Sequence, residues 1–409
     1  MRPDWQRLER LLREPPIPQL AALSQDGHRL ALVGGAIRDT LMGRTPRDID
    51  LIVEGDLNAV IDALEQARGR RPTSIGDGFQ NTHRFRWRGT SVDIAESIGT
   101  LSEDLSRRDF TINAMAVRLP AGGEAQEALV DPHHGLAHLE AKRIVPVSES
   151  TIAADPLRVM RGVRYAGQLR GFDLDPAARS VLRAHSPGLG GVAAERVVTE
   201  WLAILDSDDW AATLELAWEV GAGQVVFGER RADAATRAWA GIDIATAESA
   251  GTDPDRDAPT GRRAGRLAAL LFDLTAGGNA DDLALTLTDR RWPKSLARTA
   301  ARAAVWADQR PADERTLARL ALLDPAAAEI AGRLAALLGA GATSRLIAMA
   351  VVARETRWVT GADLHRLGVE DGPGMGDLLA AAAEGQVRGR WDDAEAARAW
   401  VAEQSRARS

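Results

Sequence analysis

Residues 29–53 decide the fold, and they read RLALVGGAIRDTLMGRTPRDIDLIV. The apolar run Arg29–Val33 predicts a strand that ends in a pair of glycines. A helix is predicted over Ala36–Met42, and the β-branched content of Asp48–Val53 predicts a second strand. The stretch therefore predicts a strand, a glycine turn, a helix and an acidic strand in that order.

Asp48 and Asp50 stand two residues apart at the start of the second predicted strand. Side chains alternate along a strand, so both carboxylates should project from one face. Mg²⁺ prefers one or two carboxylates plus substrate phosphates, and two such ions activate a hydroxyl and neutralise departing pyrophosphate. An Asp-x-Asp pair alone also fits a solvated turn, so the metal interpretation depends on its surroundings.

The glycine pair supplies those surroundings. Gly34 and Gly35 let backbone N–H groups approach a phosphate, and the helix that follows favours an anion at its start. Arg38, one turn into that helix, can reach the same phosphates. A plain tight turn is the alternative interpretation of the two glycines.

A hairpin is predicted over His83–Trp87 and Thr90–Ala95. Asp93 on its second strand is a candidate third carboxylate, which would lie beside the acidic strand if the sheet is antiparallel there. The alternative is an edge-strand aspartate that faces water. Residues Thr111–Leu119 fit either a strand or a helix.

Composition bounds the class of protein. The chain has 409 residues, 45% hydrophobic and 27% charged, which predicts a globular protein of two or more units. Absence of cysteine excludes disulfides and thiolate chemistry, and favours a cytoplasmic setting. No signal peptide or membrane span is expected. A net charge of −7 argues against a uniformly basic surface but allows a local basic groove. From about residue 150 the pattern is helical, with a loop or linker predicted over 245–263.

Five motifs, in chain order, resemble those of the tRNA nucleotidyltransferases and poly(A) polymerases. They are Val33–Asp39 with Asp48–Leu51, Arg107–Ala116, Asp131–Gly135, Asp155–Arg164, and Glu195–Arg196 with Glu200. The resemblance implies an α+β protein with a polymerase-beta-type nucleotidyltransferase head built on a mixed sheet, followed by an all-helical neck, body and tail. The expected boundaries are 1–146 for the head, 147–215 for the neck, and 216–409 for the body and tail.

The resemblance also implies roles for individual residues. The catalytic candidates, with two Mg²⁺ ions held by the first two, are Asp48, Asp50 and Asp93. The nucleotide-binding candidates are Gly34, Gly35, Arg38, Arg108, Asp109, Asn113, Asp155, Arg158, Arg161 and Arg164. Among them, Arg108 and Asp109 are expected to contact the nucleotide and its ribose 2′-OH.

The fourth motif has a physical logic of its own. A helix with a proline in its first turn is predicted over Asp155–Leu169, which would put Asp155 and Arg158 on one face, with Arg161 and Arg164 continuing it toward phosphate. A carboxylate accepts from the cytosine amino group while a guanidinium donates to its ring acceptors. Adenine also fits, whereas uracil and guanine leave polar groups unpaired. An arginine-rich solvated helix face is the alternative.

Three departures from the family pattern matter. Ala154 stands where the family has glutamate. The segment Ile94–Ser106 is shorter than in complete CCA-adding relatives, which favours a CC-adding enzyme, although a trimmed loop that leaves A addition intact stays open. Phe272 stands at the histidine position of the phosphohydrolase motif found in many relatives, so no hydrolase site is expected.

The implied substrates are CTP, with ATP as an alternative, and the tRNA 3′ end, read through its acceptor and T arms mostly by shape and backbone. Candidate phosphate contacts lie together on one predicted helical segment: Arg290, Arg291, Lys294, Arg298 and Arg302. A second resemblance, from Thr360 to Gly376, is to the tail motif of CCA-type enzymes, and a capping turn without RNA contact is its alternative. Rival functions are a poly(A) polymerase and a non-catalytic RNA-binding protein. Nothing in the sequence indicates an oligomeric state.

Overall fold

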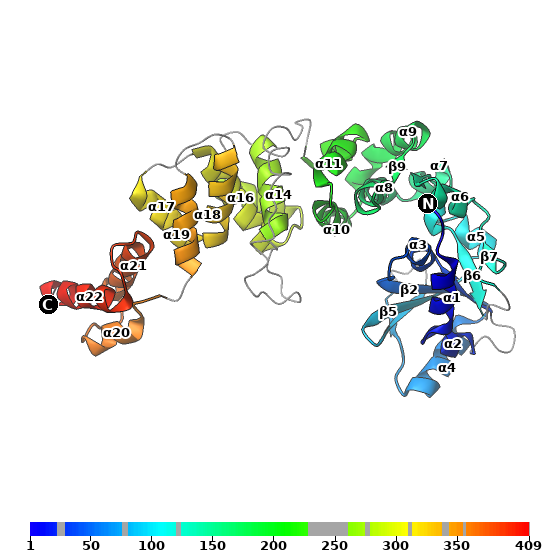
Figure 1. The fold of residues 1–409 in the computed structure, drawn as a ribbon, viewed down its shortest axis with the longest axis horizontal. Helices are drawn as coiled ribbons and strands as arrows, with labels where there is room; N and C mark the ends of the chain where they lie inside the picture. Colours follow the sequence, from blue (N-terminus) through cyan, green and yellow to red (C-terminus); the bar gives the residue numbers. More distant parts are fainter. Residues whose placement is uncertain are drawn as a thin grey trace. The chain divides into compact units, whose positions relative to one another are not determined.

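A computed structural model describes residues 1–22, 29–75, 81–119, 124–227, 261–274, 279–309, 313–337, 343–354 and 357–408. The chain packs into two units (Figure 1). Unit 1 comprises Met1–Val192 and Glu219–Val225, and unit 2 comprises Ala193–Trp218 and Val226–Ser409. This division describes packing, and the three-part organisation with boundaries after residues 146 and 215 stays a prediction.

Unit 1 is built on a seven-stranded mixed sheet, as predicted. Its strands are β1 (Arg29–Val33), β2 (Asp48–Glu54), β3 (Thr73–Ser74), β4 (Thr82–Trp87), β5 (Thr90–Glu96), β6 (Ala116–Leu119) and β7 (Leu129–Val130). They are ordered β3-β4-β5-β2-β1-β6-β7, and every adjacent pair is antiparallel except β2 and β5.

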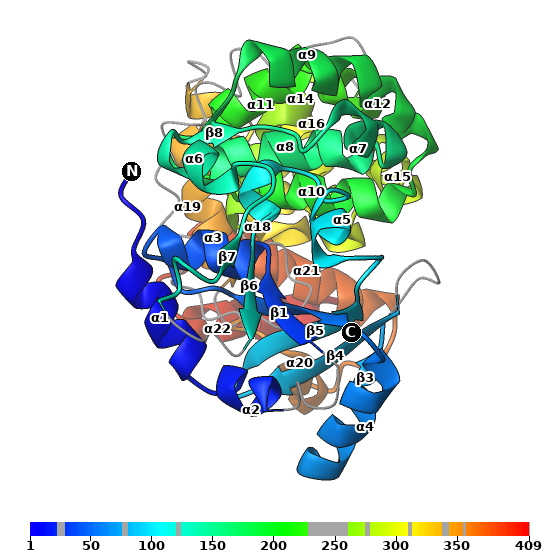
Figure 2. The ribbon, with the colours of Figure 1, turned by 90° about the vertical axis from the view of Figure 1, so that its right-hand side faces the viewer.

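Helices cover the sheet and extend unit 1 beyond it. They are α1 (Trp5–Arg13), α2 (Ile17–Ala21), α3 (Gly35–Leu41), α4 (Leu57–Arg68), α5 (Leu101–Leu105), α6 (Gly135–Glu140), α7 (Glu149–Ala154), α8 (Leu157–Gln168) and α9 (Pro176–His185). Two 3-10 helices, η1 (Thr111–Asn113) and η2 (Ser186–Gly191), and the short pair β8 (Arg143–Ile144) and β9 (Asp173–Leu174) complete it. In Figure 2, α6 to α9 gather above the sheet.

The central strands place the acidic residues on a defined face. Ala31, Val33, Ile52 and Ala95 are buried together on one face of the sheet, under Leu101 and its neighbours in α5. Each fully buried aliphatic side chain contributes roughly 1.5–3 kcal/mol, so a one-residue slip of register would be costly. Because side chains alternate along a strand, the even-numbered residues of β2 and the odd-numbered residues of β5 share this face.

Three local predictions can be scored in the sheet. The hairpin β4–β5 is confirmed, and its turn residues Arg88 and Gly89 both have positive φ, which suits the right-handed twist of the strands. Residues 111–119 are neither one strand nor one helix, because η1 precedes β6. Asp93 lies beside β2, but the antiparallel pairing was wrong. The chain returns through α4, β3 and β4, so β5 runs parallel to β2.

The described residues after Ala193 are mostly helical, as predicted. The helices are α10 (Ala194–Leu205), α11 (Trp210–Glu219), α12 (Ala222–Phe227), α14 (Gly261–Leu274), α15 (Ala280–Asp289), α16 (Lys294–Gln309), α17 (Glu314–Leu323), α18 (Pro325–Leu337), α19 (Thr343–Arg354), α20 (Gly361–Arg366), α21 (Pro373–Val387) and α22 (Ala394–Arg408). None of the helices in the described part of the chain has the length and hydropathy needed to cross a membrane. Of the predicted linker 245–263, residues 245–260 lie outside the described residues, and the last three begin α14.

Unit 2 has cores of its own. Trp201, Trp218 and Phe227 pack ring against ring, with centroids 5.0–6.2 Å apart, and Trp292 joins them. A second cluster, at the C-terminal end, gathers Leu364 and apolar residues of α21 and α22. Tryptophan therefore serves here in packing.

Candidate functional site

The glycine turn between β1 and α3 lies against the acidic strand. Gly34 adopts φ +73°, and a Cβ built on it would stand 3.0 Å from Arg108 Nη1 and 3.9 Å from Asp50 Oδ2. Any other residue would be strained there, and its Cβ would crowd Arg108 Nη1 while only touching Asp50. The glycine is thus required by a close approach, which a plain tight turn would not need.

The three predicted carboxylates, of Asp48, Asp50 and Asp93, lie on the adjacent strands β2 and β5. Asp48 and Asp50 share a face of β2, and Asp50 is paired with Asp93 across the parallel strands. Burial raises the pKa of Asp50 most strongly; Arg108 opposes this, while the charges of Asp93 and Asp48 raise the pKa further. The predicted grouping of acidic residues beside the glycine turn is therefore present.

Asp93 already has a partner. Both of its carboxylate oxygens accept hydrogen bonds from Arg84, each at 2.7 Å, across the β4–β5 pair. The neighbouring charges raise the pKa of Arg84, with the hydrogen bond to Asp93 as the largest cause. Asp93 is neither a purely solvated edge residue nor an unpaired carboxylate.

Arg108 connects the acidic group to the helices. Its Nη2 lies 3.2 Å from Asp104 Oδ2, and its backbone oxygen accepts from Arg158 Nη1 at 3.3 Å. The buried Nε of Arg108 has no hydrogen-bond partner among the described residues. The backbone of Arg108 therefore contacts α8, while its guanidinium lies near the acidic strand with donor capacity left over.

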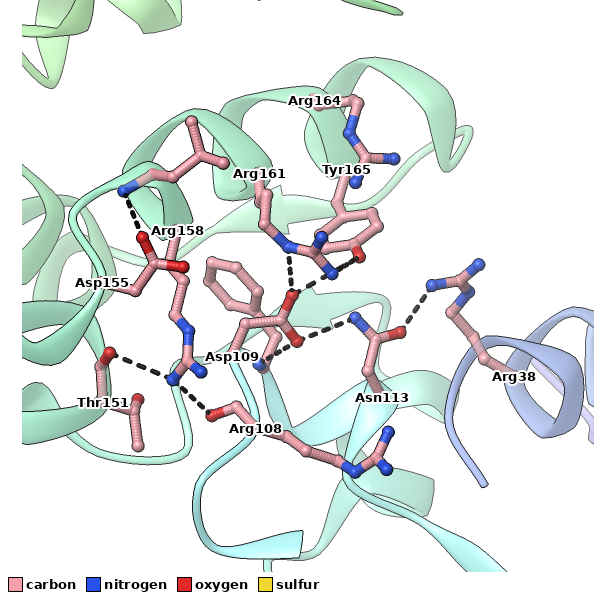
Figure 3. A network of polar contacts seen from close by, with 12 residues as sticks. Arg38, Arg108, Asp109, Asn113, Thr151, Asp155, Arg158, Arg161, Arg164 and Tyr165 are labelled. Carbon is pink, nitrogen blue, oxygen red and sulfur yellow. Dashed lines mark hydrogen bonds and ion pairs between the residues drawn. The ribbon is translucent and has the colours of Figure 1, made fainter. Parts of the chain in front are cut away.

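Asp109 is buried at the centre of a polar network (Figure 3), with 5% of its surface exposed. Its oxygens accept from the backbone of Phe110 at 2.7 Å, from Asn113 Nδ2 at 3.1 Å and from Arg161 Nε at 2.7 Å. Burial alone would raise the pKa of Asp109, but the charge of Arg161 and these hydrogen bonds lower it to about 2. Asp109 is held ionised in one orientation.

Arg38 joins the same network from α3. Its Nη1 donates to Asn113 Oδ1 at 2.5 Å, its Nε donates to Asp39 at 2.9 Å, and the side chain is mostly buried. Asn113 therefore bridges Arg38 and Asp109, which places residues from three of the resembling motifs in one connected set (Figure 3). These roles in nucleotide binding stay predictions, because no ligand is present.

The predicted helix over Asp155–Leu169 begins later than expected. Helix α8 starts at Leu157, and Asp155 is extended, with φ −140° and ψ 95°, so the one-face argument for Asp155 and Arg158 was wrong. Pro156 excludes a helical conformation for the residue before it, which explains the shift. The two side chains are nevertheless neighbours, as Figure 3 shows, and the charge of Asp155 supports the ionised form of Arg158.

The guanidinium of Arg158 is held by two backbone oxygens. Its Nη1 donates to the backbone oxygens of Thr151, at 3.0 Å, and of Arg108, at 3.3 Å. Burial lowers the pKa of Arg158, with Asp109 and Asp155 opposing the change. Arg161 and Arg164 follow at three-residue intervals on α8, as predicted, and lie toward Asp109 and Tyr165.

The connector between β5 and Arg107 is compact and ordered. Thr100 and Glu103 form a reciprocal capping box at the start of α5. The connector is also tied to β2, because Ser97 N donates to Val53 O and Leu101 N donates to Glu54 Oε1, both at 2.9 Å. These contacts tie the short connector to β2.

The remaining sequence expectations fall on unit 2 and on Ala154. Ala154 is exposed at the end of α7. Phe272 is partly buried in α14. The five basic residues do not share one helix, because Arg290 and Arg291 follow α15 while the others lie on α16. Arg291 pairs with Glu195, and Arg302 with Asp324.

At the predicted tail motif, Thr360 and Asp363 form a capping box on α20. This capping box agrees with the alternative interpretation of the motif as a helix-capping turn. Contact with RNA there stays a prediction.

Two neighbours of the site were not predicted, Arg84 and Tyr165. Tyr165 is the one tyrosine of the chain and directly follows Arg164 in the fourth motif, which is a signal that could have been noticed. Arg84 could be predicted only from its position opposite Asp93 on the neighbouring strand. That position is known only once the pairing of the strands is known.

Comparison with known proteins finds relatives over part of the chain. Residues 30–145 match the poly A polymerase head domain, and residues 171–232 match a domain described as a probable RNA and SrmB-binding site of polymerase A. The chain is 37% identical over 193 residues to the CC-adding tRNA nucleotidyltransferase of Synechocystis sp., covering 46% of this chain and 45% of that protein. It is 31% identical over 207 residues to the CCA-adding enzyme of Streptococcus pyogenes, covering 47% and 50%.

The chain thus spans about half the length of the curated relatives it matches. Solved structures extend the likeness in fold to nearly the whole chain. The Thermotoga maritima CCA-adding enzyme complexed with tRNA is 20% identical, with a TM-score of 0.69 and coverage of 97% of this chain and 98% of that one. The Bacillus stearothermophilus CCA-adding enzyme in complex with CTP is 22% identical, with a TM-score of 0.66 and coverage of 97% and 99%. By its head domain, residues 30–145, the chain is similar to the tRNA nucleotidyltransferases and poly(A) polymerases.

Proposed function

We propose that the protein is a template-independent tRNA nucleotidyltransferase that adds two cytidines to the 3′ end of tRNA from CTP, with release of pyrophosphate. The observation that carries the proposal is the convergence in unit 1 of three sets of groups. These are the carboxylates of β2, the arginines around Asp109, and the Asp155–Arg158 pair.

The donor set fits two Mg²⁺ ions. Asp48 and Asp50 present hard carboxylate oxygens on one face, and the pKa of Asp50 is raised by burial beside like charges, a cost that a bound cation relieves. Among the described residues no group of three or more histidine, aspartate or glutamate side chains is arranged to hold a metal. The ions would therefore share these carboxylates with phosphate oxygens. When bound, they would lower the pKa of the tRNA 3′-hydroxyl and offset the charge of the departing pyrophosphate.

The other residues bind and orient the nucleotide. Arg38, Arg108 and Arg161 supply positive charge for the triphosphate from three different segments. Gly34 leaves room beside Asp50 and Arg108 for a phosphate to approach. Asp109 accepts from Arg161 and Asn113 and so fixes their direction. Its place beside the nucleotide-binding arginines supports the expected contact with the ribose 2′-OH.

Base selection follows from the Asp155–Arg158 pair. Arg158 uses Nη1 to hold Thr151 and Arg108, which leaves Nε and Nη2 to donate to the ring acceptors of cytosine. The carboxylate of Asp155 would accept from the cytosine amino group. Uracil or guanine would leave a buried polar group unpaired, at a cost of roughly 1–3 kcal/mol each.

Restriction to cytidine is supported by the compact connector. Its capping box and its contacts with β2 leave no flexible loop between β5 and the second motif. The match to a CC-adding relative agrees with this. A complete CCA-adding enzyme is the second candidate, because a relative of that name matches over a similar length.

The test is incorporation on tRNA lacking its CCA end and on tRNA ending in CC, with CTP alone, ATP alone, and both. We expect two cytidines and no adenosine, and no incorporation by Asp48→Asn or Asp50→Asn. A terminal adenosine on the CC-ended tRNA would establish the CCA-adding alternative. Long adenosine tracts would identify a poly(A) polymerase, and tRNA binding without incorporation a non-catalytic RNA-binding protein.

A further inference from the structure

Tyr165 stands where the arginines of the nucleotide site meet. It is the only tyrosine in the chain, lies on α8 and is 5% exposed. Its ring meets Phe110 edge to face, with centroids 5.7 Å apart and an interplanar angle of 85°. Because Phe110 directly follows Asp109, this contact fixes the ring against the centre of the polar network.

Three guanidinium groups surround the ring of Tyr165. The Cζ atoms of Arg164, Arg38 and Arg161 lie 4.5, 5.3 and 5.7 Å from the ring centroid, respectively. Arg38 comes from α3 and the other two from α8, so the ring joins segments more than a hundred residues apart in sequence. Figure 3 shows the three side chains directed toward the ring.

The hydroxyl of Tyr165 closes a small triangle. It accepts from Arg161 Nη2 at 2.9 Å and lies 3.4 Å from Asp109 Oδ2, while Arg161 Nε donates to the same Asp109 oxygen at 2.7 Å. The two contacts of Arg161, at 2.7 and 2.9 Å, fix the arrangement of these three side chains. The contact of 3.4 Å between Tyr165 and Asp109 is a weak hydrogen bond. The hydroxyl therefore restrains Arg161, and the ring restrains all three arginines.

An aromatic ring suits this position for an electrostatic reason. Its negative face attracts a guanidinium without carrying net charge. A carboxylate in the same place would hold the arginines equally well but would subtract from the positive charge available to a polyanion. The ring lets like charges stay close together in a partly buried site without adding a negative charge to those of Asp39 and Asp109.

We propose that Tyr165 is a positioning residue for the triphosphate of the bound nucleotide, holding Arg38, Arg161 and Arg164 through its ring and Arg161 through its hydroxyl. The inference rests on the proposed function for the identity of the ligand. It assigns to Tyr165 the placement of the phosphate-binding arginines and no contact with the base. The ring supplies most of the effect, because it contacts three arginines and the hydroxyl only one.

The test compares Tyr165→Leu, Tyr165→Phe and the wild-type chain for binding of tripolyphosphate, CTP and cytidine by titration calorimetry. We expect Tyr165→Leu to weaken tripolyphosphate and CTP binding about tenfold, from the loss of the ring contacts, and to leave cytidine binding unchanged. Tyr165→Phe should stay within about threefold for tripolyphosphate, because it loses only the hydroxyl's hydrogen bond with Arg161 and its weak contact with Asp109.

Phe85→Leu is the matched control. It also removes a buried ring with an arginine beside it, since Arg68 lies 4.2 Å from the Phe85 centroid, but it does so on β4, away from the network. It should leave binding of all three ligands unchanged. Unchanged tripolyphosphate binding by Tyr165→Leu would overturn the proposal, and so would an equal loss for tripolyphosphate and cytidine, which marks a collapsed site.

A spectroscopic readout does not depend on whether the leucine variant folds. Wild-type protein labelled with 3-fluorotyrosine gives a single ¹⁹F resonance because the chain has one tyrosine. The resonance should shift on saturation with tripolyphosphate or CTP and stay in place with cytidine; a resonance indifferent to tripolyphosphate would overturn the proposal. Failure of the proposed function is separable, since it appears as absent incorporation on tRNA, whereas these experiments need no turnover.

Discussion

At the scale of single residues, Asp109 carries the clearest electrostatic signature in the protein. It is buried, ionised and held by four groups, and its pKa is lowered to about 2 from the usual 3.8. A carboxyl whose pKa is lower in the folded chain stabilises the fold above its unfolded pKa, and this stabilisation is lost as the pH falls through the folded pKa. The shift corresponds to about 2 kcal/mol.

Asp109→Asn tests that linkage. The free energy of unfolding of the wild type should exceed that of the variant by a constant amount from pH 7 down to about 5. The difference should then shrink by about 2 kcal/mol between pH 4 and pH 2. Denaturant titrations at each pH measure it. A difference independent of pH in this range would show that Asp109 is not held ionised in the folded chain.

Gly34 and Gly43 form a natural pair of test positions. Both have positive φ, +73° and +75°, but only Gly34 has neighbours within 4 Å of an added Cβ. Gly34→Ala and Gly43→Ala should each lower the free energy of unfolding by about 1 kcal/mol from backbone strain. Only Gly34→Ala should also reduce nucleotide incorporation, since it displaces Arg108. Equal incorporation by the two variants would remove the close-approach argument.

At the scale of elements, register across the sheet places two carboxylates and a guanidinium in one row. Asp50 on β2 lies beside Asp93 on β5, which lies beside Arg84 on β4. Arg84 thus offers a cation to the same acidic group that would hold the metals. Its positive charge opposes the binding of other cations there.

Arg84→Ala should therefore strengthen binding of Mn²⁺, measured by electron paramagnetic resonance of the free ion without nucleotide. The expected gain is about two- to fivefold, in line with an exposed ion pair. Arg86 lies two residues along β4 and donates to Gly89 O instead of a carboxylate, so Arg86→Ala is the control and should bind Mn²⁺ as the wild type does. Weaker Mn²⁺ binding by Arg84→Ala would mean that the guanidinium orders the site for the ions.

The elements also mark how far sequence reasoning reaches. Strand alternation predicted the shared face of Asp48 and Asp50, and glycine chemistry predicted the turn at Gly34, because both depend on residues close in sequence. The direction of β5 and the start of α8 were missed. The first depends on the path of the chain through α4 and β3, and the second on how Pro156 restricts Asp155. The contacts of Tyr165 with Arg38 link segments that no local pattern connects.

At the scale of the whole molecule, the two units differ in their number of tryptophans. All candidate catalytic and nucleotide-binding residues lie in unit 1, which contains two tryptophans, Trp5 and Trp87. The other nine belong to unit 2. Tryptophan fluorescence therefore follows mainly the unit that lacks the proposed nucleotide site.

CTP should separate the two units in thermal unfolding. A ligand present at about 100 times its Kd stabilises its own unit by roughly 2.7 kcal/mol, a rise of several degrees. Calorimetry should show this rise in one transition, while the midpoint of tryptophan fluorescence changes little. The same upward shift in both signals would mean that the chain unfolds as one cooperative whole.

The path of the chain between the units limits how the protein can be taken apart. Glu219–Val225 belongs to unit 1, although the residues on either side belong to unit 2. There the Glu219 carboxylate pairs with Arg179, and its backbone oxygen accepts from Arg183 Nε at 2.8 Å. A gene cut after codon 192 would strip α9 of both partners, whereas a cut after codon 225 keeps them and carries 193–218 along as an insert. The two units are therefore not consecutive in sequence, because a segment of unit 1 lies between the two segments of unit 2.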